Sequence, residues 1–184
     1  MAVELLSARL IAPHFGNSIY VWGAIITIFM LGLAGGYLLG GWLSLLCPSL
    51  RKLAAILCLA ALATIPAVLG ANFAMDLIFA LIRDPRYGAL AAAGLLFLVP
   101  TVISGMVSPY AVRLVVDENR RSGQYAGRLY CAATLGSAVG TVATSFYWVL
   151  YWEVNQILWA LIVISLAVGA CGLVTKNSAP ASEF

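Results

Sequence analysis

Long apolar runs, separated by short polar connections, dominate this sequence. Five runs are long enough to cross the hydrocarbon core of a bilayer as helices, which takes roughly 18 residues or more. They cover residues 19–46, 53–70, 87–107, 129–150 and 154–174. Because lipid cannot satisfy the backbone groups of an open strand, the pattern predicts an all-α, polytopic bundle of about five transmembrane helices.

The first residues form a shorter segment. Residues 1–11 are typical of a short helix, which Pro13 and Gly16 then break. This piece is too short to span a membrane alone, so it either lies in the outer interface or docks onto the bundle. Together, residues 1–176 are expected to form a single helical membrane domain, followed by a polar tail over residues 177–184.

Residues 72–86 fit the pattern less simply. Phe73, Leu77 and Leu81 share one helical face, while charged residues interrupt the apolar run. This arrangement favours an interfacial helix that lies on the outer leaflet. The alternative is one long second helix that bends at Pro66.

Composition agrees with a membrane protein. Of the 184 residues, 63% are hydrophobic and only 9% are charged, well below the roughly 25% of an ordinary soluble domain. The net charge of +3 is small and the basic residues form no long run. Nucleic-acid binding therefore has little support, and the lipid bilayer is the expected surrounding.

The distribution of basic residues predicts the orientation. Seven of the ten lie in the connections on one side of the membrane, namely Arg51, Lys52, Arg113, Arg120, Arg121, Arg128 and Lys176. Only Arg9, Arg83 and Arg86 lie on the other side. The positive-inside rule then places the C-terminus in the cytoplasm, as for a multi-pass protein of a bacterial inner membrane.

Cysteines and aromatic residues support the same orientation. All four cysteines fall at or near the predicted cytoplasmic ends, where thiols stay reduced; they are Cys47, Cys58, Cys131 and Cys171. The predicted outer ends carry many Trp and Tyr residues, which favour the headgroup layer. Examples are Tyr20, Trp22, Tyr87, Tyr147, Trp148, Tyr151 and Trp152.

Glycines in the first span repeat every four residues. Gly32, Gly36 and Gly40 therefore line one helical face, which lets another backbone approach closely and gives van der Waals contact in lipid. Static helix packing is the preferred interpretation of this face. The functional alternative is a sliding or rocking surface in a transporter.

The fourth span carries small polar residues with a similar spacing. The stripe consists of Tyr130, Thr134, Ser137, Thr141 and Thr144, with Gly136 and Gly140 beside it. We interpret the two glycines as further helix-packing positions. Small hydroxyls at this spacing either bond across helices or line a polar path, and packing is again the preferred interpretation.

Asp, Glu, Lys, Arg and His are absent from the interiors of the five predicted spans. Such groups usually mark proton relays and ion-coupling sites, so a conventional proton-coupled pump is not expected. Glu4, Arg9 and His14 precede the first span and form a candidate outer-leaflet site. A solvated interfacial histidine is the simpler interpretation of His14.

Basic side chains cluster in the connection between the third and fourth spans. Arg113, Arg120, Arg121 and Arg128 are candidates for contact with anionic lipid headgroups or with the acidic surface of a partner. A simple topological anchor is the preferred interpretation of these residues.

Sequence motifs for catalysis are absent. The chain has no glycine-rich phosphate loop, no nucleophile elbow, no CxxC pair and no metal-binding His/Glu pair. We therefore predict no catalytic residues, no metal and no cofactor.

Four ordered segments resemble a known family. They are residues 4–22 (ELLSARLIAPHFGNSIYVW), 36–41 (GYLLGG), 105–114 (GMVSPYAVRL) and 127–141 (GRLYCAATLGSAVGT). Together they are similar to the membrane domain of the spermidine-synthase-like membrane proteins, in many of which this domain is fused to an aminopropyltransferase-like domain. The resemblance implies a helical fold with transporter-like features and no established activity.

Two departures from that family shape the expected function. The segment at residues 4–22 usually ends a full membrane helix, so we expect the preceding helix to be missing or supplied elsewhere. No nucleoside pocket or acidic pair of an aminopropyltransferase follows the fifth span, so the chain is not expected to make spermidine unaided.

The sequence thus favours a non-catalytic membrane module that acts with another chain, either a second copy, a transferase-like subunit or a larger membrane complex. A small oligomeric transporter of a polyamine-like or other small solute is the main alternative. An intramembrane enzyme that uses Glu4, Arg9 and His14 is a weaker one.

Overall fold

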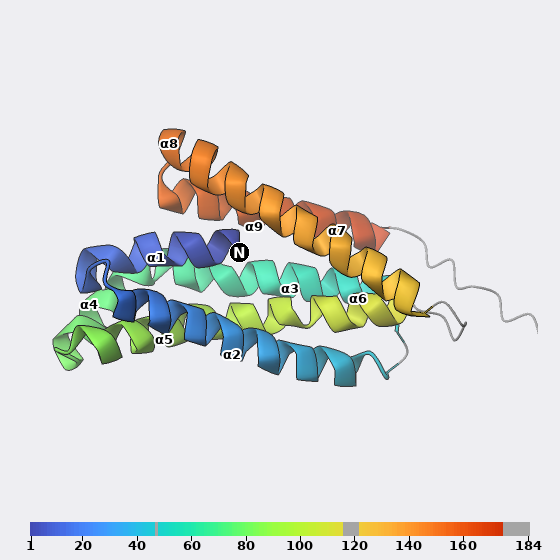
Figure 1. Ribbon diagram of the computed structural model, residues 1–184, viewed down its shortest axis with the longest axis horizontal. Helices are drawn as coiled ribbons and strands as arrows, with labels where there is room; N and C mark the ends of the chain where they lie inside the picture. Colours follow the sequence, from blue (N-terminus) through green and yellow to red (C-terminus); the bar gives the residue numbers. More distant parts are fainter. Residues whose placement is uncertain (47, 116–121, 175–184) are drawn as a thin grey trace, which may run out of the picture.

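The computed structural model describes residues 1–46, 48–115 and 122–174, and this part of the chain is all-α (Figure 1). The helices are α1 (Ala2–Phe15), α2 (Ile19–Leu43), α3 (Leu50–Leu69), α4 (Ala71–Leu81), α5 (Pro85–Gly105), α6 (Val107–Val115), α7 (Ser122–Val142), the π-helix η1 (Ala143–Trp148), α8 (Val149–Tyr151) and α9 (Val154–Val174). The predicted fold class is confirmed. The predicted tail at 177–184 lies outside the described residues.

Five helical stretches in the described residues are long and apolar enough to cross a membrane. They are Ile19–Leu43, Leu50–Leu69, Pro85–Val115, Gly123–Tyr151 and Val154–Val174. The third combines α5 with α6, and the fourth combines α7, η1 and α8. Each predicted span therefore corresponds to one of these stretches, with ends shifted by up to eight residues.

The helices form a row with two further elements laid against it. α2 packs against α5, α5 against α3, and α3 against α9. α1 lies against α2, α4, α5 and α9, while α7 runs at an angle above the row (Figure 1). Alternating topology places five helix ends at the same end of the bundle (Figure 1). They are the ends of α2, α6 and α9 and the starts of α3 and α7.

Two apolar clusters hold the row together. The larger joins α1, α2, α4 and α5 with one residue of α3, and it includes Ile11, Ile25, Met75 and Phe97, each nearly or fully buried. The smaller joins α1, α3 and α9 around residues such as Ile157. Helix α1 contributes to both clusters, so it docks into the bundle instead of lying on a surface.

The junction between α3 and α4 answers one question about residues 72–86. α3 ends at Leu69 and α4 begins at Ala71, so the second span does not continue as one long helix bent at Pro66. The reason is local, because Gly70 leaves the helical conformation with φ −96° and ψ 1°. Phe73 and Leu81 on α4 remain largely exposed. Placement of α4 in the outer interface stays a prediction.

Candidate functional site

The glycine face of α2 lies against α5 and α6. A Cβ atom added to Gly32 would lie 2.9 Å from the side chain of Thr101, and one added to Gly36 would lie 2.8 Å from the Cα atom of Gly105. A Cβ at Gly40 would lie 2.6 Å from the Cα atom of Met106. All three glycines therefore let the two helix backbones approach closely.

The glycines of α7 are placed differently. Around both Gly136 and Gly140, the space that a Cβ atom would need is open, with nothing within 4 Å. The span Gly123–Tyr151 is only 6% buried over its most apolar 18 residues, against 22–39% in the other four spans. The spacing of these glycines matches that in α2, but this chain provides no neighbour for them among its described residues.

A cavity of ≈ 490 Å³ lies beneath α7. α7 supplies Tyr130, Ala133, Thr134 and Ser137, which share one helical face over two turns. The opposite wall comes from Tyr37 of α2 and from Ser108 and Pro109 of α6, and Met1 lies at one end. The cavity thus gathers five hydroxyl-bearing side chains from three helices.

The remaining polar residues of the predicted stripe lie elsewhere. Thr144, at the π-helix, is buried and lines a smaller cavity of ≈ 220 Å³, to which Arg9 and Trp22 also contribute. Thr141, between the two cavities in sequence, is half-buried and lines neither of them. The structure therefore divides the stripe between two cavities.

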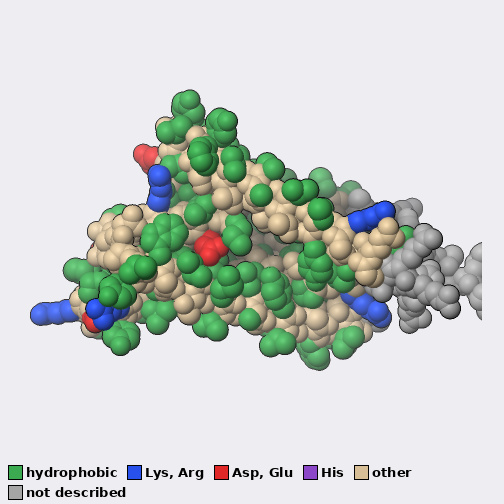
Figure 2. All heavy atoms as spheres, viewed as in Figure 1, with side chains coloured by type: hydrophobic (Ala, Val, Ile, Leu, Met, Phe, Trp, Pro, Cys, Tyr) green, Lys and Arg blue, Asp and Glu red, His purple; other side chains and the backbone are tan. Residues whose placement is uncertain are grey.

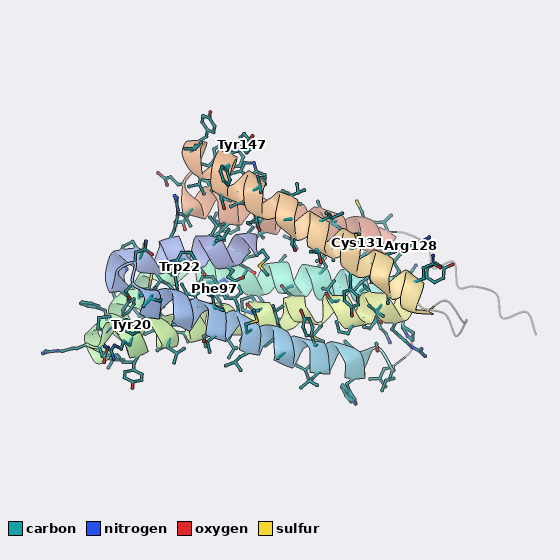
Figure 3. The ribbon with its side chains drawn as sticks, in the orientation of Figure 1. Tyr20, Trp22, Phe97, Arg128, Cys131 and Tyr147 are labelled. Atoms are coloured by element: carbon teal, nitrogen blue, oxygen red, sulfur yellow. The ribbon has the colours of Figure 1, made fainter. Side chains whose placement is uncertain are left out.

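A third cavity, of ≈ 160 Å³, lies under the first turn of α1. Its lining includes the carboxylate-bearing Glu4, three hydroxyl-bearing residues and two phenylalanines: Thr64, Thr101, Ser104, Phe29 and Phe97. Met1 lines both this cavity and the one beneath α7, so the two adjoin. Phe97 belongs to the apolar cluster to which α1 also contributes, and Trp22 packs against that cluster (Figure 3).

The third cavity lies near the middle of the bundle along its length. Phe29 and Leu33 flank the midpoint of α2, and Pro100 is at the midpoint of the span Pro85–Val115. Figure 1 shows the first residue at about half the length of the bundle, from which α1 runs toward the end where α2 begins. Glu4 is thereby carried toward mid-depth, although α1 itself is too short to span.

The structure does not gather the candidate outer-leaflet residues into one site. Glu4 lines the mid-depth cavity, and Arg9 lines the cavity beside Trp22. His14, at the far end of α1, bonds through Nε2 to Oδ1 of Asp76 at 3.0 Å. Helical spacing explains the separation, since Glu4 and His14 are about 15 Å apart along the axis.

The histidine bond fixes a proton position. A carboxylate only accepts, so Nε2 of His14 must donate to Asp76. The other ring nitrogen, Nδ1, is buried and has no hydrogen-bond partner among the described residues. The pair ties α1 to α4 at the end of the bundle where α2 begins. Asp76 was not predicted as a site residue, and its only signal in the sequence was the break it makes in an apolar run.

The basic cluster is only partly described. Arg113 and Arg128 are exposed at the ends of α6 and α7, whereas Arg120 and Arg121 lie outside the described residues. Figure 3 shows Arg128 and Cys131 toward the start of α7, and Tyr147 in η1 at the opposite end of the same span. Within the described ranges, no group of three or more His, Cys, Asp or Glu residues is arranged to hold a metal ion.

Comparison of the chain with models of known families, with curated proteins and with solved structures finds no match. The function must therefore be argued from the geometry of the cavities and of the exposed face of α7.

Proposed function

We propose that this chain is a non-catalytic membrane module that acts with another chain, and that a helix of this partner covers α7. The observation that supports the proposal is a mismatch in the span Gly123–Tyr151. It has the lowest mean hydropathy of the five spans and is also the least buried. A span of this kind is poorly suited to contact lipid on nearly every side.

The chemistry of the exposed face fits a helix better than lipid. Gly136 and Gly140 provide a flat surface at four-residue spacing, and small hydroxyls flank them. Such surfaces allow close backbone contact and hydrogen bonds across helices, neither of which lipid tails provide. The partner is a second copy, a larger membrane complex or, by the resemblance to the spermidine-synthase-like membrane proteins, a transferase-like subunit.

Extraction of the tagged protein in mild detergent, followed by sizing and mass spectrometry, tests this proposal. We expect a stoichiometric complex from the unmodified chain and its loss in Gly136→Leu. Gly23→Leu is the matched control, because the Cβ position of Gly23 is also open but lies on α2. A monomer from the unmodified chain, or a complex that Gly136→Leu leaves intact, contradicts the proposal.

Transport of a small solute is the second candidate, and a separate observation favours it. The cavity beneath α7 is lined by hydroxyls and adjoins the cavity that holds Glu4. Together they give a route, lined in part by hydroxyl groups, from mid-depth toward the predicted cytoplasmic end. Uptake of radiolabelled polyamines and other small solutes into vesicles that contain the purified chain tests this candidate, and absence of uptake for all of them would argue against it.

The enzyme alternative receives no support from the geometry. It required His14 to act with Glu4 or Arg9 in one pocket. His14 bonds Asp76 instead, and the other two residues line different cavities.

A further inference from the structure

Glu4 stands out among the ionisable side chains of the bundle. It is half-buried at the first turn of α1, and no Lys, Arg or His among the described residues forms an ion pair with it. Arg9, five residues along the same helix, lines a different cavity. In Figure 2, most charged side chains lie toward the two ends of the bundle. No described Lys, Arg or His side chain lines the cavity that Glu4 faces, and the α-amino group of Met1, which also lines it, forms no ion pair with Glu4.

The depth of this carboxylate demands an explanation. A charged group near the centre of a membrane is costly, and such groups are generally paired or placed at a substrate or ion path. The pairing is not provided by the structure described above. A mobile cation that enters the cavity would provide it.

The other lining residues suit a cation. The hydroxyl of Thr64 donates to the carbonyl oxygen of Ala60 at 2.9 Å, which leaves its lone pairs to accept from another donor. Phe29 and Phe97 lie with ring centroids 5.8 Å apart and also line the cavity. Aromatic faces attract organic cations through their quadrupoles. The set thus combines one anionic acceptor, neutral oxygen acceptors and aromatic surface.

We propose that Glu4 binds a small alkylammonium cation in this cavity. A primary ammonium has three N–H donors, which match a carboxylate and two hydroxyl oxygens, while its alkyl part lies against the aromatic rings. The volume of ≈ 160 Å³ is that of roughly five water molecules, so it accommodates an amine of a few carbons.

An inorganic cation fits this site less well. Hard metal ions take about six or more oxygen ligands in a close shell. Here one carboxylate and three hydroxyls, from Thr64, Thr101 and Ser104, share the lining with apolar side chains. This proposal names the substrate class of the transport candidate, and the physiological use of the site rests on that candidate. Binding of the cation itself does not depend on transport or on a partner of α7.

Equilibrium dialysis of the full chain in lipid nanodiscs against radiolabelled propylammonium tests the site. We expect saturable binding that weakens at least about tenfold in Glu4→Gln, because this change removes the charge and keeps the shape. Glu153→Gln is the matched control, since Glu153 is an exposed carboxylate at the start of α9. Phe97→Leu, which keeps Glu4, should weaken propylammonium binding if the ring contributes to the site.

The outcomes separate this proposal from the transport candidate. Absence of saturable binding, equal binding by the unmodified chain and Glu4→Gln, or equally effective competition by sodium would each overturn the proposal. If Glu4→Gln elutes as an aggregate, Phe97→Leu provides the test. Propylammonium binding by Phe97→Leu that is as tight as binding by the unmodified chain then overturns the proposal. Binding without uptake into vesicles would remove transport and leave the site, whereas uptake without saturable propylammonium binding would remove the site and leave transport.

Discussion

A single methyl group added at Gly36 should measurably weaken the bundle. The Cβ atom of Gly36→Ala would lie 2.8 Å from the Cα atom and 3.0 Å from the carbonyl carbon of Gly105, and closer still to the carbonyl oxygen of Val102. Carbon atoms in contact prefer about 3.5–4.0 Å. All three obstructing atoms belong to the backbone, so no side-chain rotation relieves the clash, and α2 and α5 must separate by roughly 1 Å.

The net cost follows from two opposing terms. Overpacking a close interface costs about 1–3 kcal/mol. Alanine in place of glycine returns up to about 1 kcal/mol through its higher helix propensity. Gly36→Ala should therefore lose about 1–2 kcal/mol in the free energy of unfolding. Gly41→Ala in the same helix meets nothing within 4 Å, so it should be neutral or stabilising by up to about 1 kcal/mol.

The measurement is the unfolding equilibrium in mixed micelles, followed by tryptophan fluorescence during titration with a denaturing detergent. Gly36→Ala should shift the midpoint to a lower fraction of denaturant, whereas Gly41→Ala should not. Equal midpoints for the two variants would refute the reasoning, because they would show that the close contact between α2 and α5 contributes nothing that a methyl group disturbs.

Three further predictions concern other parts of the chain. Tyr110 is fully buried and its hydroxyl accepts from the backbone N–H of Ser49 at 3.1 Å, so Tyr110→Phe should cost about 1 kcal/mol of stability in the same unfolding assay, and an unchanged midpoint would contradict this. The side chains of His14 and Asp76 are partly exposed, at 24% and 74%. A double-mutant cycle with His14→Gln and Asp76→Asn should therefore give a coupling free energy below about 1 kcal/mol. A coupling above about 2 kcal/mol would contradict this expectation. A fluorescent protein fused to the C-terminus should fluoresce, and an alkaline phosphatase fused there should be inactive, because both report a cytoplasmic end; the opposite result would reverse the orientation.

Periodicity predicted the helices and the packing face of α2 but not every contact. A four-residue spacing places Gly32, Gly36 and Gly40 on one side of a helix whatever surrounds it. The same spacing holds for Gly136 and Gly140, yet their side of α7 is open. Spacing within a helix fixes which residues share a face, whereas the neighbour of that face depends on how the helices assemble.

The position of Glu4 could not be obtained by examining each apolar run separately. Its segment is too short to span, so the sequence alone leaves it outside the membrane. Apolar docking of α1, through residues such as Leu6 and Ile11, carries Glu4 into the bundle. The partners of His14 and Tyr110 were equally inaccessible, because they lie 62 and 61 positions away along the chain, and no local pattern encodes such a pairing.

Helix α7 lies over a cavity and contacts neighbouring helices on either side of it. It contacts α6 near one end and α1 near the other, and it continues into a six-residue π-helix at Ala143–Trp148. π-helical turns are rare and are often found at functional sites. Between these contacts, one side of α7 faces the cavity beneath it. A molecule that enters this cavity therefore contacts α7 on one side and helices α2 and α6 on the other.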